Sequence, residues 1–311
     1  MQAGRLDEAR ATFDEALARK MDNSGLRGNR AILAFLQRDN AALAEQWEWV
    51  AHHPKDVELM LGKTRMQMYY GQFSSAHRLA EDTIKQAKAS TPNASFSEEF
   101  ANDAIQEAIV GNAVKARRAA AKAVAGPQKR SVQSDLALAL ALAGDSAQAQ
   151  TLADSIDQKF PLNTLVQNYD LPAIRAALHL HANDPAGAIE ILRPALKYDF
   201  AYEEDGFNSL YPAYLRGLAY LQIGDGRSAA VEFQKMLDHP GLIERDVDGA
   251  LALLQMARAE KTAGDSAAAR KYYEQFLVLW KVADPEIPAY REAKKEHAKL
   301  LTSLQTHVSR Q

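Results

Sequence analysis

The stretch LYPAYLRGLAYLQIGDGRSAAVEFQKMLDHPG, residues 210–241, has the pattern of two helices joined by a tight turn. Gly217 in the first half and Ala229 in the second are small residues, which allow two helix axes to approach to about 8–10 Å. Tyr220 and Phe233 are large aromatic residues suited to filling the space beside that contact. The stretch therefore predicts an antiparallel helix pair.

The turn of this pair recurs along the chain. Gly224 can adopt the left-handed backbone conformation that ends a helix, and Asp225 can cap the helix that follows. A turn residue followed five positions later by alanine occurs at intervals of 32 to 41 residues: Gly4/Ala9, Asp39/Ala44, Gly71/Ala76, Gly111/Ala116, Gly144/Ala149, Asn183/Ala188, Gly224/Ala229 and Gly264/Ala269. Such periods are typical of stacked helix pairs that share one continuous core. We expect an all-α solenoid.

Residues 210–241 resemble a tetratricopeptide repeat. In that repeat, helix A carries a small residue and then an aromatic one, while helix B carries an alanine, an aromatic residue and a closing proline. These positions are taken here by Gly217, Tyr220, Ala229, Phe233 and Pro240. The other units keep the turn residue and the alanine but lose most of the aromatic residues. The resemblance implies a right-handed superhelix, with repeats over residues 1–280 and a capping helix and tail over residues 281–311.

The repeats begin on half a unit. The motif LDEARATFDEALARK, residues 6–20, reads as helix B, and no helix A precedes it. Its apolar stripe is then covered on one side only: Leu6, Ala9, Phe13, Ala16 and Leu17. We therefore expect this chain to be a fragment of a longer protein, whose N-terminal end is either mobile or covered by contact with a second copy.

The second half of the chain resembles a known family in the order of its sequence motifs. FPLNTLVQNYDLPAIRAALHL, LYPAYLRGLAYL, AAVEFQKMLDHPG and GALALLQMARAEKTAGDSAAARKYYEQFLVLWKVADPEIP, within roughly residues 95 to 300, are similar to the C-terminal tetratricopeptide region of bacterial eukaryotic-like serine/threonine protein kinases, notably the acidobacterial type. The resemblance implies a sensory or docking region behind a kinase domain and often a membrane helix. Similar repeats follow winged-helix transcription regulators, which is the alternative. This sequence has no glycine-rich nucleotide loop, His-Arg-Asp or Asp-Phe-Gly motif, so kinase activity is not assigned to it.

Composition excludes several classes of function. The 311 residues include 37 basic and 40 acidic ones, a formal charge of −3, which does not favour nucleic-acid binding. No apolar run reaches the roughly 18 residues of a membrane helix, so we expect no membrane contact by this segment, although a parent kinase is often membrane-anchored. Without cysteine, the chain has no disulfide or thiolate site and fits either a cytoplasmic or an extracytoplasmic location.

Neither a metal site nor a catalytic site is predicted. His179 and His181 are two positions apart, whereas two ligands on one helix need a spacing of three or four. His52 and His53 precede a proline at a helix end. Carboxylate pairs occur at Glu98/Glu99, in an expected cap, and at Glu203/Glu204, in an expected loop. We expect no cofactor and no enzymatic role.

The expected function is protein binding in the concave groove of the superhelix. In this repeat type the positions thirteen, ten, six and three before the turn residue face the groove. That rule selects Arg65 and Met68 in the unit of Gly71, Tyr211, Tyr214, Leu218 and Leu221 in the unit of Gly224, and Leu251, Leu254, Arg258 and Lys261 in the unit of Gly264. Aromatic residues beside cations suit a peptide with an acidic group. The alternative is that the tyrosines belong to the core and the cations are solvated.

Overall fold

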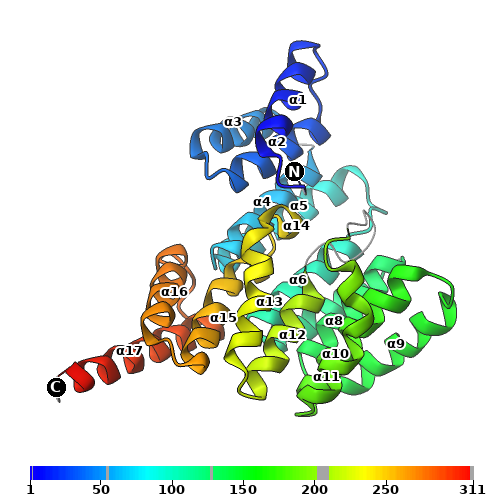
Figure 1. The fold of residues 1–311 in the computed structure, drawn as a ribbon. Helices are drawn as coiled ribbons and strands as arrows, with labels where there is room; N and C mark the ends of the chain where they lie inside the picture. The colour runs from blue at the N-terminus through cyan, green and yellow to red at the C-terminus, as the bar shows by residue number, and fades with distance from the viewer. Residues whose placement is uncertain (2, 54–55, 127–128, 202–209, 309–311) are drawn as a thin grey trace.

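The computed structural model describes residues 1, 3–53, 56–126, 129–201 and 210–308, and all regular structure in these residues is helical. The α-helices are α1 (Leu6–Ala18), α2 (Ser24–Leu36), α3 (Asn40–His52), α4 (Val57–Tyr69), α5 (Phe73–Ser90), α6 (Ser97–Ile109), α7 (Ala113–Val124), α8 (Arg130–Leu142), α9 (Ser146–Lys159), α10 (Leu171–His181), α11 (Pro185–Ile191), α12 (Tyr211–Gln222), α13 (Gly226–Asp238), α14 (Pro240–Ile243), α15 (Val247–Ala263), α16 (Ser266–Leu279) and α17 (Pro288–Val308). A π-helical turn at Val166–Asp170 (η1) precedes α10, and a 3-10 helix at Arg193–Tyr198 (η2) follows α11. Successive helices pack as antiparallel pairs, which confirms the all-α, right-handed superhelical solenoid (Figure 1).

The helix pair α12–α13 has the geometry that its sequence predicts. A Cβ atom at Gly217 would lie 2.5 Å from the ring of Phe233, so only glycine permits this approach. Ala229 at the same contact has no exposed surface. Gly224 has a φ of +78°, and the Asp225 carboxylate accepts a hydrogen bond of 3.0 Å from the Ser228 amide at the start of α13. Gly217 and Ala229 are therefore the points of closest helix contact.

Most predicted turn residues also adopt the left-handed conformation. They are Gly4, Gly71, Gly111, Gly144, Asn183 and Gly264. The prediction for Asp39 is wrong: Arg38 takes the left-handed conformation, with a φ of +55°. Asp39 instead caps α3, since its carboxylate accepts a hydrogen bond of 3.0 Å from the Ala42 amide. The turn and the cap are adjacent positions, and the short side chain of an aspartate suits either one.

The C-terminal repeats contact the turns of repeats much earlier in the chain. The Trp280 indole Nε1 donates a hydrogen bond of 2.9 Å to the carbonyl oxygen of Tyr69. The Asp284 amide donates to the carbonyl of Gly71 at 2.9 Å, and the Ala289 amide donates to the carbonyl of Val110 at 3.1 Å. These bonds lie beside the place where α15 packs against α4 and α6 (Figure 1). Units far apart in the sequence therefore contact one another directly.

The apolar core follows the same path. Met68, Phe73 and Val110 belong to one buried cluster with residues of α12 to α17, while a second cluster extends from α6 to α12. One turn of the superhelix thus brings the C-terminal repeats back onto α4, α5 and α6, and apolar burial there adds to the backbone hydrogen bonds.

The two ends of the chain differ in burial. No residue of α1 is buried, and the predicted apolar stripe from Leu6 to Leu17 is only half-buried. The C-terminal helix α17 runs from Pro288 to Val308, and Ala293 within it is fully buried. Residues 202–209, which include Glu203 and Glu204 of the expected loop, lie outside the described residues. Among those described, no helix is long and apolar enough to cross a membrane.

Candidate functional site

The aromatic residues predicted to line a groove belong to the core. Met68, Tyr211 and Tyr214 are 2%, 4% and 2% exposed, so their side chains offer no surface to a partner. Leu251 and Leu254 are fully buried as well, while Leu218 and Leu221 are half-buried. The groove prediction is corrected for the buried residues because other helices cover them. Tyr211 belongs to the buried cluster of α6 to α12, whereas Tyr214, Leu251 and Leu254 belong to the cluster that includes α12 to α17.

The predicted cation Arg258 already has partners within the chain. Its guanidinium makes two hydrogen bonds, of 2.9 and 2.8 Å, to the carboxylate of Glu296 on α17. It also donates to Gln255, whose amide donates to the Tyr214 hydroxyl at 3.1 Å. Arg258 thus anchors the capping helix, whereas Lys261 is exposed. The structure does not bring Arg65 into this network.

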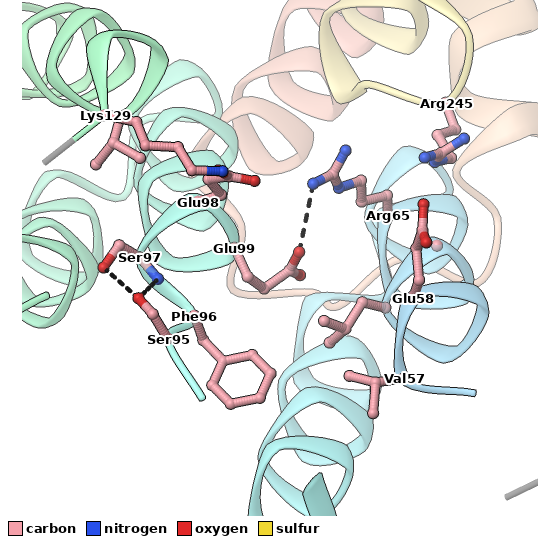
Figure 2. A pocket seen from close by; sticks show the side chains of 13 residues that line it. Val57, Glu58, Arg65, Ser95, Phe96, Ser97, Glu98, Glu99, Lys129 and Arg245 are labelled. Carbon is pink, nitrogen blue, oxygen red and sulfur yellow. Dashed lines mark hydrogen bonds and ion pairs between the residues drawn. The ribbon is translucent and has the colours of Figure 1, made fainter. Parts of the chain in front are cut away.

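Arg65 instead lines a cavity of about 480 Å³ built from four parts of the chain. One face of α4 supplies one wall, the start of α6 the opposite one, and Lys129 with Val132 at the start of α8 a third. Arg245, in the connector before α15, completes it (Figure 2). This volume lies in the range of small-molecule or side-chain pockets.

Arg65 and Glu99 form the central ion pair of this pocket. Arg65 Nη2 lies 3.4 Å from Glu99 Oε2 (Figure 2). The Thr64 hydroxyl lies 3.3 Å from the other carboxylate oxygen. Burial raises the pKa of Glu99 above its usual value, and the Arg65 charge only partly offsets this. Burial also acts against the Arg65 cation, but the carboxylates of Glu99 and Asp246 outweigh it and raise the pKa of Arg65.

Arg245 is the less well compensated of the two arginines. Its side chain is 17% exposed, and its ion pair with the neighbouring Glu244 spans 3.3 Å. Burial, followed by the positive charge of Arg65, lowers the pKa of Arg245 below its usual value. The Nε groups of Arg65 and Arg245 are both buried and have no hydrogen-bond partner among the described residues. A buried donor without an acceptor costs about 1–3 kcal/mol, so both arginines are held here at a cost to the fold.

Lys129 adds a third cation at the rim. It is exposed and forms an ion pair with the exposed Glu98, in the first turn of α6 (Figure 2). Both side chains can therefore exchange this ion pair for contacts with solvent. Glu98 and Glu99 both lie in the first turn of α6, where a cap is expected, but Glu99 is buried. Sequence reasoning also missed Arg245, because the groove rule covers helix A positions only. The sequence feature that could have indicated Arg245 is a basic residue within the connector HPGLIERD, residues 239–246.

The histidines considered in the sequence have ordinary local partners. His52 and His53 hydrogen bond through Nδ1 to the carbonyls of Glu48 and Trp49, one turn earlier in α3. His179 Nδ1 lies 2.8 Å from a carboxylate oxygen of Asp184. None of these groups gathers the three ligands that a metal site requires, within the residues that the structure describes.

Comparison with known proteins gives a structural likeness. No family model and no curated protein matches this chain. Among solved structures, it is similar to yeast Tom70, with a TM-score of 0.47, 16% sequence identity, and coverage of 96% of this chain and 59% of that chain. The chain thus spans less than two thirds of that structure. The fold assignment rests on the helix pairs and their turns.

Proposed function

We propose that this chain is a non-catalytic protein-interaction module that binds an acidic group of a protein or peptide partner between Arg65 and Arg245. The observation that carries the proposal is that two arginines, Arg65 and the less well compensated Arg245, line one cavity. A carboxylate can accept hydrogen bonds from two guanidinium groups at once, and such charge-assisted bonds are about twice as strong as neutral ones.

The charges of the pocket favour binding of a single acidic group at one position. They disfavour the binding of polyanions in general. Glu58, Glu98 and Glu99 line the same cavity as the three cations, so the pocket as a whole is near neutral. A carboxylate placed away from the arginines would therefore meet like charge. This arrangement suits a peptide with one acidic side chain or a C-terminal carboxylate, flanked by apolar residues that contact Leu61, Phe96 and Val132.

Selection of peptides tests this function. A displayed library of random peptides would be panned against the chain and against Arg245→Gln, with Arg270→Gln as the matched control, because Arg270 pairs with Glu274 on the exposed face of α16. We expect enriched peptides to share an acidic position, and Arg245→Gln to reduce their capture by about tenfold or more. Peptides without an acidic residue, or equal capture by the two variants, would rule out this pocket.

For the parent protein, we propose the sensory or docking region of a bacterial serine/threonine protein kinase. The sequence motifs within residues 95 to 300 that resemble the repeat region of those kinases support this proposal. Sequencing the gene upstream of the codon for Met1 tests it. Kinase nucleotide and catalytic loops there would support the proposal, whereas a winged-helix domain would favour a transcription regulator.

A further inference from the structure

Three potential metal ligands from two neighbouring helices meet at one point outside the arginine pocket. His77 lies on α5, and Asp103 and Glu107 lie one turn apart on the facing side of α6. His77 Nε2 is 2.8 Å from Asp103 Oδ1 and 3.4 Å from Glu107 Oε1. The three ligand atoms lie within 4.8 Å of one another, the one such group among the described residues.

Glu107 is unusual for a carboxylate. Its side chain has no exposed surface, and its Oε1 atom, which faces His77, has no hydrogen-bond partner in the described part of the chain. The other oxygen, Oε2, accepts a hydrogen bond of 2.6 Å from the Asn112 side chain. A buried carboxylate with one oxygen oriented and the other unpaired is costly for the fold. A cation at Oε1 would remove that cost, and Asn112 would hold the ligand in place.

The spacing fits a small divalent ion. Bonds of about 2.0–2.1 Å in a tetrahedral site place neighbouring ligand atoms about 3.3 Å apart. The distance from His77 Nε2 to Glu107 Oε1 already has that value, and the distance to Asp103 Oδ1 requires a widening of about half an ångström. Both His77 and Asp103 are partly exposed, at 28% and 20%, so their side chains have room to adjust.

The three ligands also line a cavity of about 190 Å³, which leaves space for a fourth ligand such as water. From these contacts we propose that His77, Asp103 and Glu107 bind a divalent first-row transition metal ion, with one coordination position open toward this cavity. One imidazole nitrogen with two carboxylates favours Zn²⁺ or Mn²⁺ over Mg²⁺ and Ca²⁺, which prefer oxygen ligands alone. The bound ion links α5 to α6 and so joins two successive repeats.

Lys115 on α7 opposes the metal. Its ammonium lies 3.9 Å from Glu107 Oε1, where it partly neutralises the carboxylate, and its side chain is 46% exposed. Metal binding must displace this charge toward solvent. Lys115→Gln removes this charge and should therefore strengthen metal binding. If the cluster only stabilised helix packing, this substitution would not strengthen metal binding.

Calorimetric titration with Zn²⁺ tests the proposal on the full chain. We expect Asp103→Asn and Glu107→Gln each to weaken Zn²⁺ binding by about tenfold or more, and Lys115→Gln to tighten it. The matched control is Asp184→Asn, because Asp184 lies 2.8 Å from His179 but has no third ligand beside it. Zn²⁺ should also raise the melting temperature of the wild-type chain and leave that of Asp103→Asn unchanged.

A second measurement covers the case in which a variant fails to fold. X-ray absorption at the zinc edge of the loaded wild-type chain should show one imidazole and otherwise oxygen ligands. Two or more imidazole ligands would place the zinc at other histidines and overturn the proposal. Equal affinity in wild type, Asp103→Asn and Glu107→Gln, or an equal loss in Asp184→Asn, would overturn it as well.

Discussion

The indole Nε1 of Trp280 donates a hydrogen bond of 2.9 Å to the carbonyl oxygen of Tyr69, 211 positions earlier in the chain. Trp280 has no exposed surface, and a Cβ at the adjacent Gly71 would lie 3.0 Å from its ring. This contact joins the C-terminal repeats to the turn between α4 and α5. Because α4 also carries Arg65, and Arg245 precedes α15, closure of this superhelical turn sets the distance between the two arginines.

Loss of the indole donor should weaken this closure. In Trp280→Phe an aromatic ring remains, but the Tyr69 carbonyl loses its partner, which we expect to lower the free energy of unfolding by about 1–3 kcal/mol. Urea denaturation of wild type and Trp280→Phe measures this change in the free energy of unfolding. Trp47→Phe is the control, because Trp47 is half-buried and contacts Lys63 at the surface. Equal effects of the two substitutions would mean that the Trp280 contact contributes nothing beyond its ring.

The contact between helices within a repeat should tolerate no added volume. Ala229 is fully buried where α13 meets α12, so Ala229→Leu should destabilise the chain by about 1–3 kcal/mol through overpacking. Ala11→Leu, at an exposed position of α1, should change the melting midpoint little. A melting midpoint of Ala229→Leu equal to that of wild type would show that the helix register is wrong.

The half-buried carboxyl of Asp135 should make stability depend on pH. Burial, together with the nearby Asp170, raises the pKa of Asp135 from 3.8 to about 8. The folded state then holds a proton that the unfolded state has released, so this group lowers stability progressively as the pH rises from about 4 to 8. A pKa change of one unit corresponds to about 1.4 kcal/mol, and we expect Asp135→Asn to stabilise the chain by at least about 1 kcal/mol at pH 8.

Thermal melting of Asp135→Asn between pH 5 and pH 8 checks this dependence. The gain over wild type should grow with pH, whereas Asp154→Asn, at an exposed position of α9, should show no such trend. A gain that is constant or falls with pH would mean that Asp135 is ionised in the folded chain.

The repeat architecture could be predicted from the sequence because each turn has a local cause. Gly224 adopts the left-handed conformation, and Asp225, the next residue, caps α13. The pocket could not be predicted in this way. Arg65 and Arg245 meet because the superhelix closes after about four repeats, and closure depends on the sum of many small rotations between helix pairs.

The error about the groove has a different cause. The rule that selected Tyr211 and Tyr214 identifies which helix face is concave, and it does not tell whether other helices cover that face. Tyr211 lies in the buried cluster of α6 to α12, and Tyr214 contacts the Phe233 ring and accepts a hydrogen bond from Gln255, so the two tyrosines are 4% and 2% exposed. His77 and Asp103 escaped notice for a related reason: they are 26 positions apart, and only the packing of α5 against α6 brings them together.

The binding of an acidic group at Arg245 is tested most directly by a double-mutant cycle. A selected peptide and its neutral analogue, with the acidic residue replaced by its amide, would be titrated calorimetrically into wild type and Arg245→Gln. In the proposed complex the Arg245 guanidinium contacts the carboxylate of the peptide directly, so the effect of removing one group depends on whether the other is present. We therefore predict a coupling energy of at least about 1.5 kcal/mol. A coupling energy of zero, with the two changes acting additively, would contradict the proposed role of this pocket.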